Sequence, residues 1–114
     1  MFYSISTVGV FTLALPIIIP LDEALAFLES SLQTFPDDKM LKCNKARIFC
    51  ELGKNAEAIA ILNTVIKEDS KFSVAHTLKG QALENLGKKK DAIVCYKQAL
   101  ALNPSDVFAQ EKLK

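Results

Sequence analysis

Apolar residues recur every three or four positions through most of the chain, which is the period of one face of an α-helix. In residues 22–34, for example, Leu25, Leu28 and Leu32 form one apolar stripe. Turn-forming residues separate this segment from others of similar length. The predicted helices span 22–34, 39–52, 55–67, 73–86 and 89–102, with a short final helix from Asp106. Because nothing between residues 21 and 114 alternates with the period of a strand, we predict an all-α fold.

The expected helix ends carry typical turn and cap residues. Pro36 stops the first helix, and Gly53 and Gly87 stand where a left-handed C-terminal cap would close a helix. Ser73 and Ser105 are the predicted N-terminal caps of the helices that follow them. The connections are only about two to five residues long, so consecutive helices are expected to pack antiparallel as hairpins.

Two stretches of the chain, 52–59 and 86–93, share the pattern L-G-K-x-x-x-A-I, and the second repeats the first after a period of about 34 residues. A fixed period of this length is typical of stacked small units rather than of a closed domain around a pocket. Leucine and glycine are predicted to close the first helix of each unit, and alanine and isoleucine to pack the second helix against it. The pattern therefore favours a binding function over catalysis.

These residues resemble the tetratricopeptide repeat (TPR), a pair of antiparallel helices with small residues at the crossing and a proline near the end. The unit 73–106 matches the family closely, at Gly80, Leu83, Gly87, Ala92, Tyr96, Ala99 and Pro104. The preceding unit, 39–72, has Ser70 in place of the proline and Val65 in place of the usual alanine. Residues 22–36 match only the second helix of an earlier unit. The resemblance implies a short right-handed solenoid of stacked hairpins over residues 22–114.

The resemblance also implies a protein-binding function, as a scaffold or adaptor of the kind found among co-chaperones. In this family the first helix of each unit lines a concave groove that holds a peptide or helix of a partner. The residues expected to bind a partner here are Met40, Cys43, Asn44, Arg47, Val74, Thr77, Leu78 and Gln81, with Glu51 and Asn85 at the end of the same helices.

Family members that clamp the C-terminal carboxylate of heat-shock chaperones use lysine, asparagine and arginine at particular positions of these helices. Asn44 matches the asparagine, but Val74 and Leu78 occupy the positions of the lysine and the arginine. The sequence therefore predicts a mildly apolar groove, better suited to an amphipathic helix or an extended hydrophobic segment.

Residues 1–21 contain no charged side chain and form a segment separate from the repeats. The segment reaches the length of about 20 residues that spans a bilayer, although Pro16, Pro20 and the missing basic flank argue against that use. The interpretations left open are a membrane anchor or interfacial segment, an arm covering the exposed flank of helix 22–34, a secretory signal, and a disordered or non-native start of a truncated chain. The arm hypothesis predicts that deleting residues 1–20 lowers thermal stability and raises dye binding to apolar surface.

Charge gives no case for nucleic acid as a partner. The chain has 14 basic and 13 acidic residues and a net charge of +1. Its one basic cluster, residues 88–90, has no interleaved aromatic side chain on which a base could stack, so we interpret it as a solvated corner.

The sequence predicts neither an enzyme nor a metal or cofactor site. The three cysteines form no C-x-x-C pair, and the single histidine, His76, has no partner at metal-ligand spacing. We expect free, packed thiols and a cytoplasmic protein. Self-association by stacking at the C-terminal end, residues 107–113, is a further alternative, because arrays usually need about three repeats to be stable.

Overall fold

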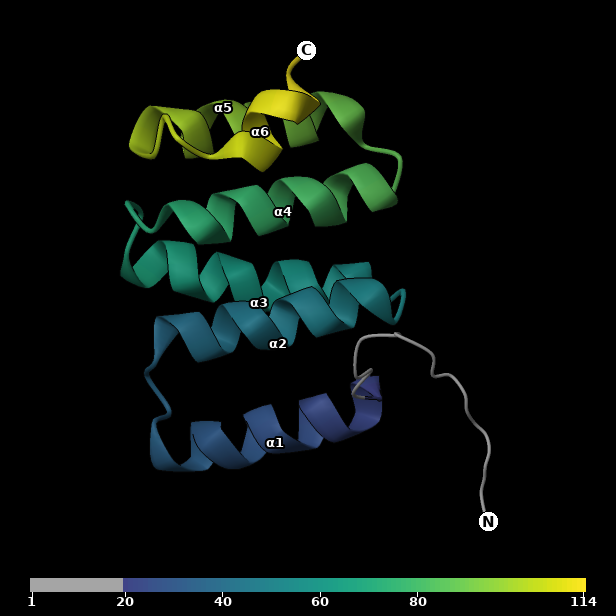
Figure 1. Ribbon diagram of the computed structural model, residues 1–114, viewed down its shortest axis with the longest axis vertical. Helices are drawn as coiled ribbons and strands as arrows, with labels where there is room; N and C mark the ends of the chain where they lie inside the picture. Colours follow the sequence, from purple (N-terminus) through teal and green to yellow (C-terminus); the bar gives the residue numbers. More distant parts are fainter. Residues whose placement is uncertain (1–19) are drawn as a thin grey trace, which may run out of the picture.

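Six helices follow one another along residues 20–114, the part of the chain that the computed structural model describes. They are α1 (Leu21–Thr34), α2 (Lys39–Glu51), α3 (Asn55–Glu68), α4 (Ser73–Asn85), α5 (Lys89–Leu102) and α6 (Val107–Lys112). Figure 1 shows α1 to α5 stacked one above another, with α6 lying across α5 at the C-terminal end. The described residues contain no strand, so the predicted all-α fold of stacked hairpins is confirmed. Of the segment interpreted as an anchor or arm, residues 1–21, all but residues 20 and 21 lie outside the described part, and Leu21 is the first residue of α1.

The two L-G-K copies form the same C-terminal cap. Gly53 and Gly87 have φ angles of +82° and +81°, in the left-handed region that glycine tolerates best. The Gly53 N–H donates to the Cys50 carbonyl at 3.1 Å, and the Lys54 N–H donates to the Phe49 carbonyl at 2.8 Å. The cap at Gly87 repeats both bonds at 2.9 Å. This bonding pattern is the Schellman motif, which satisfies the last carbonyl groups of a helix and turns the chain back.

The predicted N-terminal caps at Ser73 and Ser105 are wrong. Ser73 is the first residue of α4, because the chain already turns from an extended conformation at Phe72. Asp106 caps α6 in place of Ser105, and its Oδ1 accepts a hydrogen bond from the Ala109 N–H at 3.0 Å. A carboxylate at this position also interacts favourably with the positive end of the helix dipole.

The core consists of two groups of buried side chains in series, as expected of a repeat array. The first group joins α2, α3 and α4 and contains Cys43, Ala46, Cys50, Ala58, Leu62, Val65, Ala75, Leu78 and Ala82. The second joins α4, α5 and α6 and contains Leu83, Ala92, Cys95, Tyr96, Ala99 and Ala109. All three cysteines are free and buried, which confirms the prediction of packed thiols.

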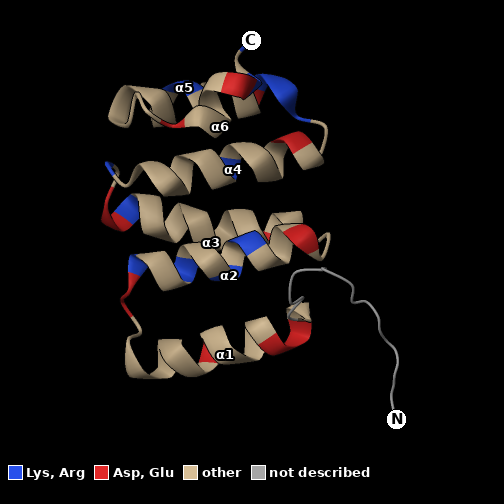
Figure 2. Cartoon of the chain, viewed as in Figure 1, with Lys and Arg blue, Asp and Glu red and all other residues tan. Residues whose placement is uncertain are grey.

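Charged side chains are distributed along the stack in the view of Figure 2 rather than gathered in one region. Two ion pairs, Lys39–Asp69 at 3.0 Å and Lys42–Glu68 at 3.3 Å, join the start of α2 to the end of α3. Residues 88–90 are exposed at the corner before α5. Among the described helices, none combines the length and the apolar character needed to cross a membrane.

Glu84 connects α6 to the last unit. Its carboxylate accepts a hydrogen bond from the Tyr96 hydroxyl at 2.8 Å and pairs with Lys112 Nζ at 3.1 Å. The hydrogen bond from Tyr96 is the main reason why the pKa of Glu84 lies below its ordinary value of 4.5, and the Lys112 ammonium adds to this effect. Burial of the same carboxyl works in the opposite direction.

This network predicts a pH-dependent contribution to stability. Because folding lowers the pKa of Glu84, its stabilising effect is complete above the unfolded value of 4.5 and is lost as pH falls through the folded value. We expect Glu84→Gln to lower the melting temperature at neutral pH. Below about pH 5, the melting temperature of the variant should fall less steeply with acidification than that of the wild type. Circular dichroism melts across this range measure the effect. Glu57→Gln, at an exposed position of α3, serves as the control, and an equal pH slope in wild type and Glu84→Gln would contradict the prediction.

Candidate functional site

A hollow of about 260 Å³ lies on the face formed by α2, α4 and α6, and we call it the central hollow. It is lined by Arg47, Val74, Thr77, Leu78, Gln81, Asp106 and Phe108. Five of these, all on α2 or α4, are among the residues that the sequence predicts to bind a partner. The repeat brings them together because α2 and α4 are first helices of successive units and contact each other directly.

A second hollow, of about 540 Å³, adjoins the first between α1 and α2, and we call it the end groove. It is lined by Glu23, Ala24, Phe27, Leu28, Asn44, Arg47 and Ile48. Arg47 belongs to both hollows, so they form neighbouring parts of one surface. Asn44, which the sequence predicts to lie with the other partner-binding residues, lines the end groove instead.

The remaining predicted residues lie elsewhere. Met40 is 44% exposed but lines neither hollow. Cys43 is fully buried in the first core group, and this burial raises the pKa of its thiol to about 11 against the opposing effect of the Arg47 guanidinium. The Cys43 side chain therefore packs the core and presents no surface to a partner. Asn85 donates a hydrogen bond to Asn55 at 3.0 Å.

Sequence reasoning missed the contribution of α6 to the central hollow. Phe108 lies one repeat period after Val74, so the period itself could have placed it on this face. Asp106 fixes the start of α6 there, because its Oδ2 accepts a hydrogen bond from the Thr77 hydroxyl at 2.6 Å while Oδ1 caps the helix. Thr77 thus holds α6 in place as well as lining the hollow.

The central hollow is apolar with one cation at its edge. Val74 is half-buried and Leu78 is buried against the first core group, so both positions that carry charge in a carboxylate clamp are apolar here. Arg47 is exposed and makes no ion pair with another of the described residues. The acid of this hollow, Asp106, is already bonded to Thr77 and α6. The arrangement can accept an apolar side chain and leaves the guanidinium available to a carboxylate.

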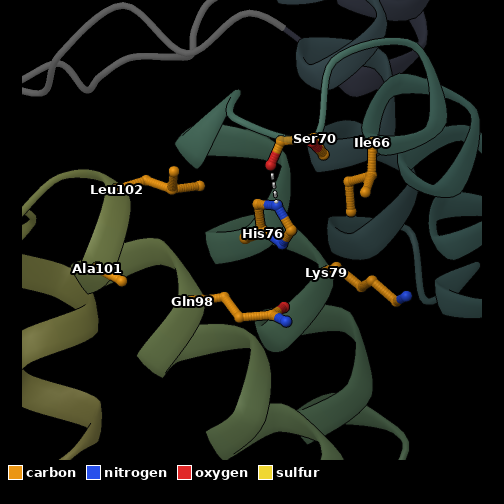
Figure 3. A pocket seen from close by; sticks show the side chains of 7 residues that line it. All are labelled: Ile66, Ser70, His76, Lys79, Gln98, Ala101 and Leu102. Atoms are coloured by element: carbon orange, nitrogen blue, oxygen red, sulfur yellow. Dashed lines mark hydrogen bonds between the residues drawn. The ribbon is translucent and has the colours of Figure 1, made fainter.

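A third hollow, of about 440 Å³, lies between α3, α4 and α5 and is lined by Ile66, Ser70, His76, Lys79, Gln98, Ala101 and Leu102. Figure 3 shows the His76 ring in this space, bonded to Ser70. His76 is 7% exposed, and its Nε2 donates to the Ser70 carbonyl oxygen at 2.9 Å. This bond gives the histidine a structural role in holding the turn before α4. The described residues contain no group of three or more metal-ligating side chains.

Comparison with known proteins supports the repeat assignment. A family profile described as tetratricopeptide repeat matches residues 21–82, and a second one with the same description matches residues 73–106. A curated relative, the ancillary SecYEG translocon subunit of Buchnera aphidicola, is 33% identical over 89 residues. The match covers 75% of this chain and 46% of that protein, so the chain spans about half of its length.

Solved structures show the same fold. The first TPR domain of human RPAP3 superposes with a TM-score of 0.75 at 26% identity, covering 82% of this chain and 73% of that one. The first TPR of Spaghetti (RPAP3) bound to the HSP90 peptide SRMEEVD gives a TM-score of 0.74 at 26% identity, covering 82% and 74%. Since the profile over residues 21–82 spans more than half of the chain and the helices stack as in these domains, the chain belongs to the tetratricopeptide repeat family.

Proposed function

We propose that the face formed by α2, α4 and α6 holds a segment of a partner protein, with an apolar side chain in the central hollow and an acidic group beside Arg47. The observation that carries the proposal is the hollow itself, in which Val74, Leu78 and Phe108 surround an apolar space next to an exposed guanidinium. Phe108 is 41% exposed and therefore offers an aromatic surface to a ligand. Phenylalanine and arginine are both enriched in the cores of protein interfaces relative to the rest of the surface.

The structural relatives support peptide binding as a class of function, because one of them is bound to the HSP90 peptide SRMEEVD. The apolar Val74 and Leu78 set this chain apart from members that grip a C-terminal carboxylate with charged residues. We therefore propose that the peptide is recognised mainly through an apolar side chain, with little dependence on a free C-terminus. On this proposal the chain is a binding module without catalysis of its own, and its cytoplasmic location stays a prediction.

The test uses peptides selected from a random phage-displayed library against the chain, with SRMEEVD as a reference. We expect the selected peptides to contain a large apolar residue near an acidic one. Phe108→Ala and Arg47→Glu are each expected to weaken their binding by about 10-fold, because the first removes apolar contact in the hollow and the second removes the cation beside the acidic group. Fluorescence polarisation measures the dissociation constants. SRMEEVD with a free or an amidated C-terminus is expected to bind with similar affinity.

Matched controls lie on α5, outside the hollow. Val94→Ala removes apolar surface at a 55% exposed position, and Lys97→Glu reverses a charge at an exposed one. Neither is expected to change the affinity. Undiminished binding by both Phe108→Ala and Arg47→Glu, or a large loss on amidation of SRMEEVD, would contradict the proposal.

A further inference from the structure

The position of Ala24 shows that, within residues 20–114, one side of α1 is not covered by another helix. Ala24 lies one repeat period before Ala58 and two before Ala92, at the same place in the repeat. Ala58 and Ala92 are 0% and 1% exposed, because α2 and α4, the first helices of their units, pack over them. Ala24 is only half-buried. A position built for close helix packing is therefore left partly open in the described part of the chain.

Phe27 gives an independent sign of the same gap. Its side chain is 71% exposed, whereas its counterparts in the later units, Ile61 and Cys95, are half-buried and buried. Phe27 and Ala24 both line the end groove, whose other apolar residues are Leu28 and Ile48. The groove thus lies where a first helix would pack in a complete unit, against the second helix of its own unit and the first helix of the next.

The order of the chain indicates which segment belongs in this groove. In the two whole units, residues 52–54 and 86–88 separate the covering helix from the second helix. Residues 18–20 are the corresponding positions before α1. The covering helices α2 and α4 have 13 residues each, and residues 1–19 are long enough to run the same distance. They carry no charged side chain, so an apolar groove is a favourable environment for them.

We propose that residues 1–19 fold back over the end groove and occupy the position that a first helix takes in the two whole units. In that position their apolar side chains cover Ala24 and Phe27, which are partly or largely exposed within the described residues. The proposal is independent of the proposed peptide-binding function, because the peptide contacts in the central hollow do not need residues 1–19.

The test measures how readily a thiol at position 24 is alkylated in the full chain. Ala24→Cys places the thiol in the end groove, and Ala26→Cys places a control thiol at an exposed position of the same helix. Each is combined with Leu15→Asp and Ile18→Asp, which put two charges into the apolar segment. We expect the aspartates to raise the rate at which N-ethylmaleimide alkylates position 24 about 10-fold, because a thiol that is no longer covered is accessible to the reagent. The rate at position 26 is expected to stay unchanged. Peptide mass spectrometry locates the label.

A control pair, Ser4→Asp with Ser6→Asp, adds the same charge at polar positions of the segment and is expected to leave both rates unchanged. An unchanged alkylation rate at position 24 with Leu15→Asp and Ile18→Asp would overturn the proposal. An equal rise at positions 24 and 26 would also overturn it, because it would show that α1 itself has become less ordered. Protection at position 24 that disappears on dilution would also overturn it, because a second copy of the chain would then be the covering element. Protection that is independent of concentration and lost only with the two aspartates supports the proposal.

Discussion

Leu62→Ala is expected to lower the free energy of unfolding by about 2–5 kcal/mol, the range found when a buried leucine is cut back to alanine. Leu62 is 0% exposed and lies in the core group that joins α2, α3 and α4. The substitution removes apolar contacts and leaves a cavity that the surrounding helices fill only in part. Units of a repeat array stabilise one another through the contacts between neighbours. Leu62 lies where α2 and α3 of one unit meet α4 of the next, so the cavity affects both whole units.

The measurement is urea unfolding followed by circular dichroism, with a thermal melt as a second readout. In a domain of this size, each kcal/mol of lost stability lowers the melting temperature by about 4–8 °C. Leu102→Ala, at a 39% exposed position of α5, is the matched control and is expected to cost about 1 kcal/mol or less. Similar losses in the two variants would show that Leu62 does not have the central packing role described here.

Gly80→Ala is the second substitution with a large expected effect, a loss of about 1–3 kcal/mol despite the better helix propensity of alanine. A Cβ atom at Gly80 would lie 2.7 Å from Cε1 and 2.9 Å from Cδ1 of Tyr96. The Tyr96 ring cannot move aside easily, because it is 2% exposed and its hydroxyl is bonded to Glu84 at 2.8 Å. Gly80 is therefore required for the close approach of α4 and α5. Thermal and urea unfolding measure the loss.

The preceding unit supplies the compensating pair. Ala46 and Leu62 stand one repeat period before Gly80 and Tyr96, and both are fully buried. We expect Gly80→Ala combined with Tyr96→Leu to be less destabilised than the sum of the single changes by about 1 kcal/mol, because the smaller side chain makes room for the methyl group. Strictly additive losses in this double-mutant cycle would show that contact with the Tyr96 ring is not the reason for glycine at position 80.

The helices and their turns could be predicted closely from local sequence. The apolar period and the L-G-K caps place the ends of the helices within one residue of the observed bounds, because caps such as Gly53 and Gly87 act through bonds to nearby residues. The predicted caps at Ser73 and Ser105 are wrong for different reasons. The N-cap position of α4 is Phe72, which makes no side-chain capping hydrogen bond, so Ser73 lies one residue inside the helix. Asp106 rather than Ser105 caps α6, since its carboxylate bonds to the start of α6 and also accepts a hydrogen bond from Thr77 on α4.

The candidate site could be predicted only in part. The repeat phase places Arg47, Val74 and Gln81 on one face, and the structure brings them together in the central hollow. The same phase also selects Cys43, which the structure buries, because periodicity identifies the face of a helix but not how deeply a neighbouring helix covers it. The part played by Phe108 depends on where α6 packs, which the local pattern does not contain.

By itself, the sequence determined the helices, their repeat period and the family, because these depend on bonds and apolar spacing within a few turns of helix. Only the tertiary structure decided which side chains remain exposed. It placed the Phe108 ring in the same hollow as Arg47 and left Ala24 partly open. The exposure of a side chain depends on contacts between helices that lie apart in the chain. A periodic pattern shows that one face of a helix is apolar but does not show which element covers that face.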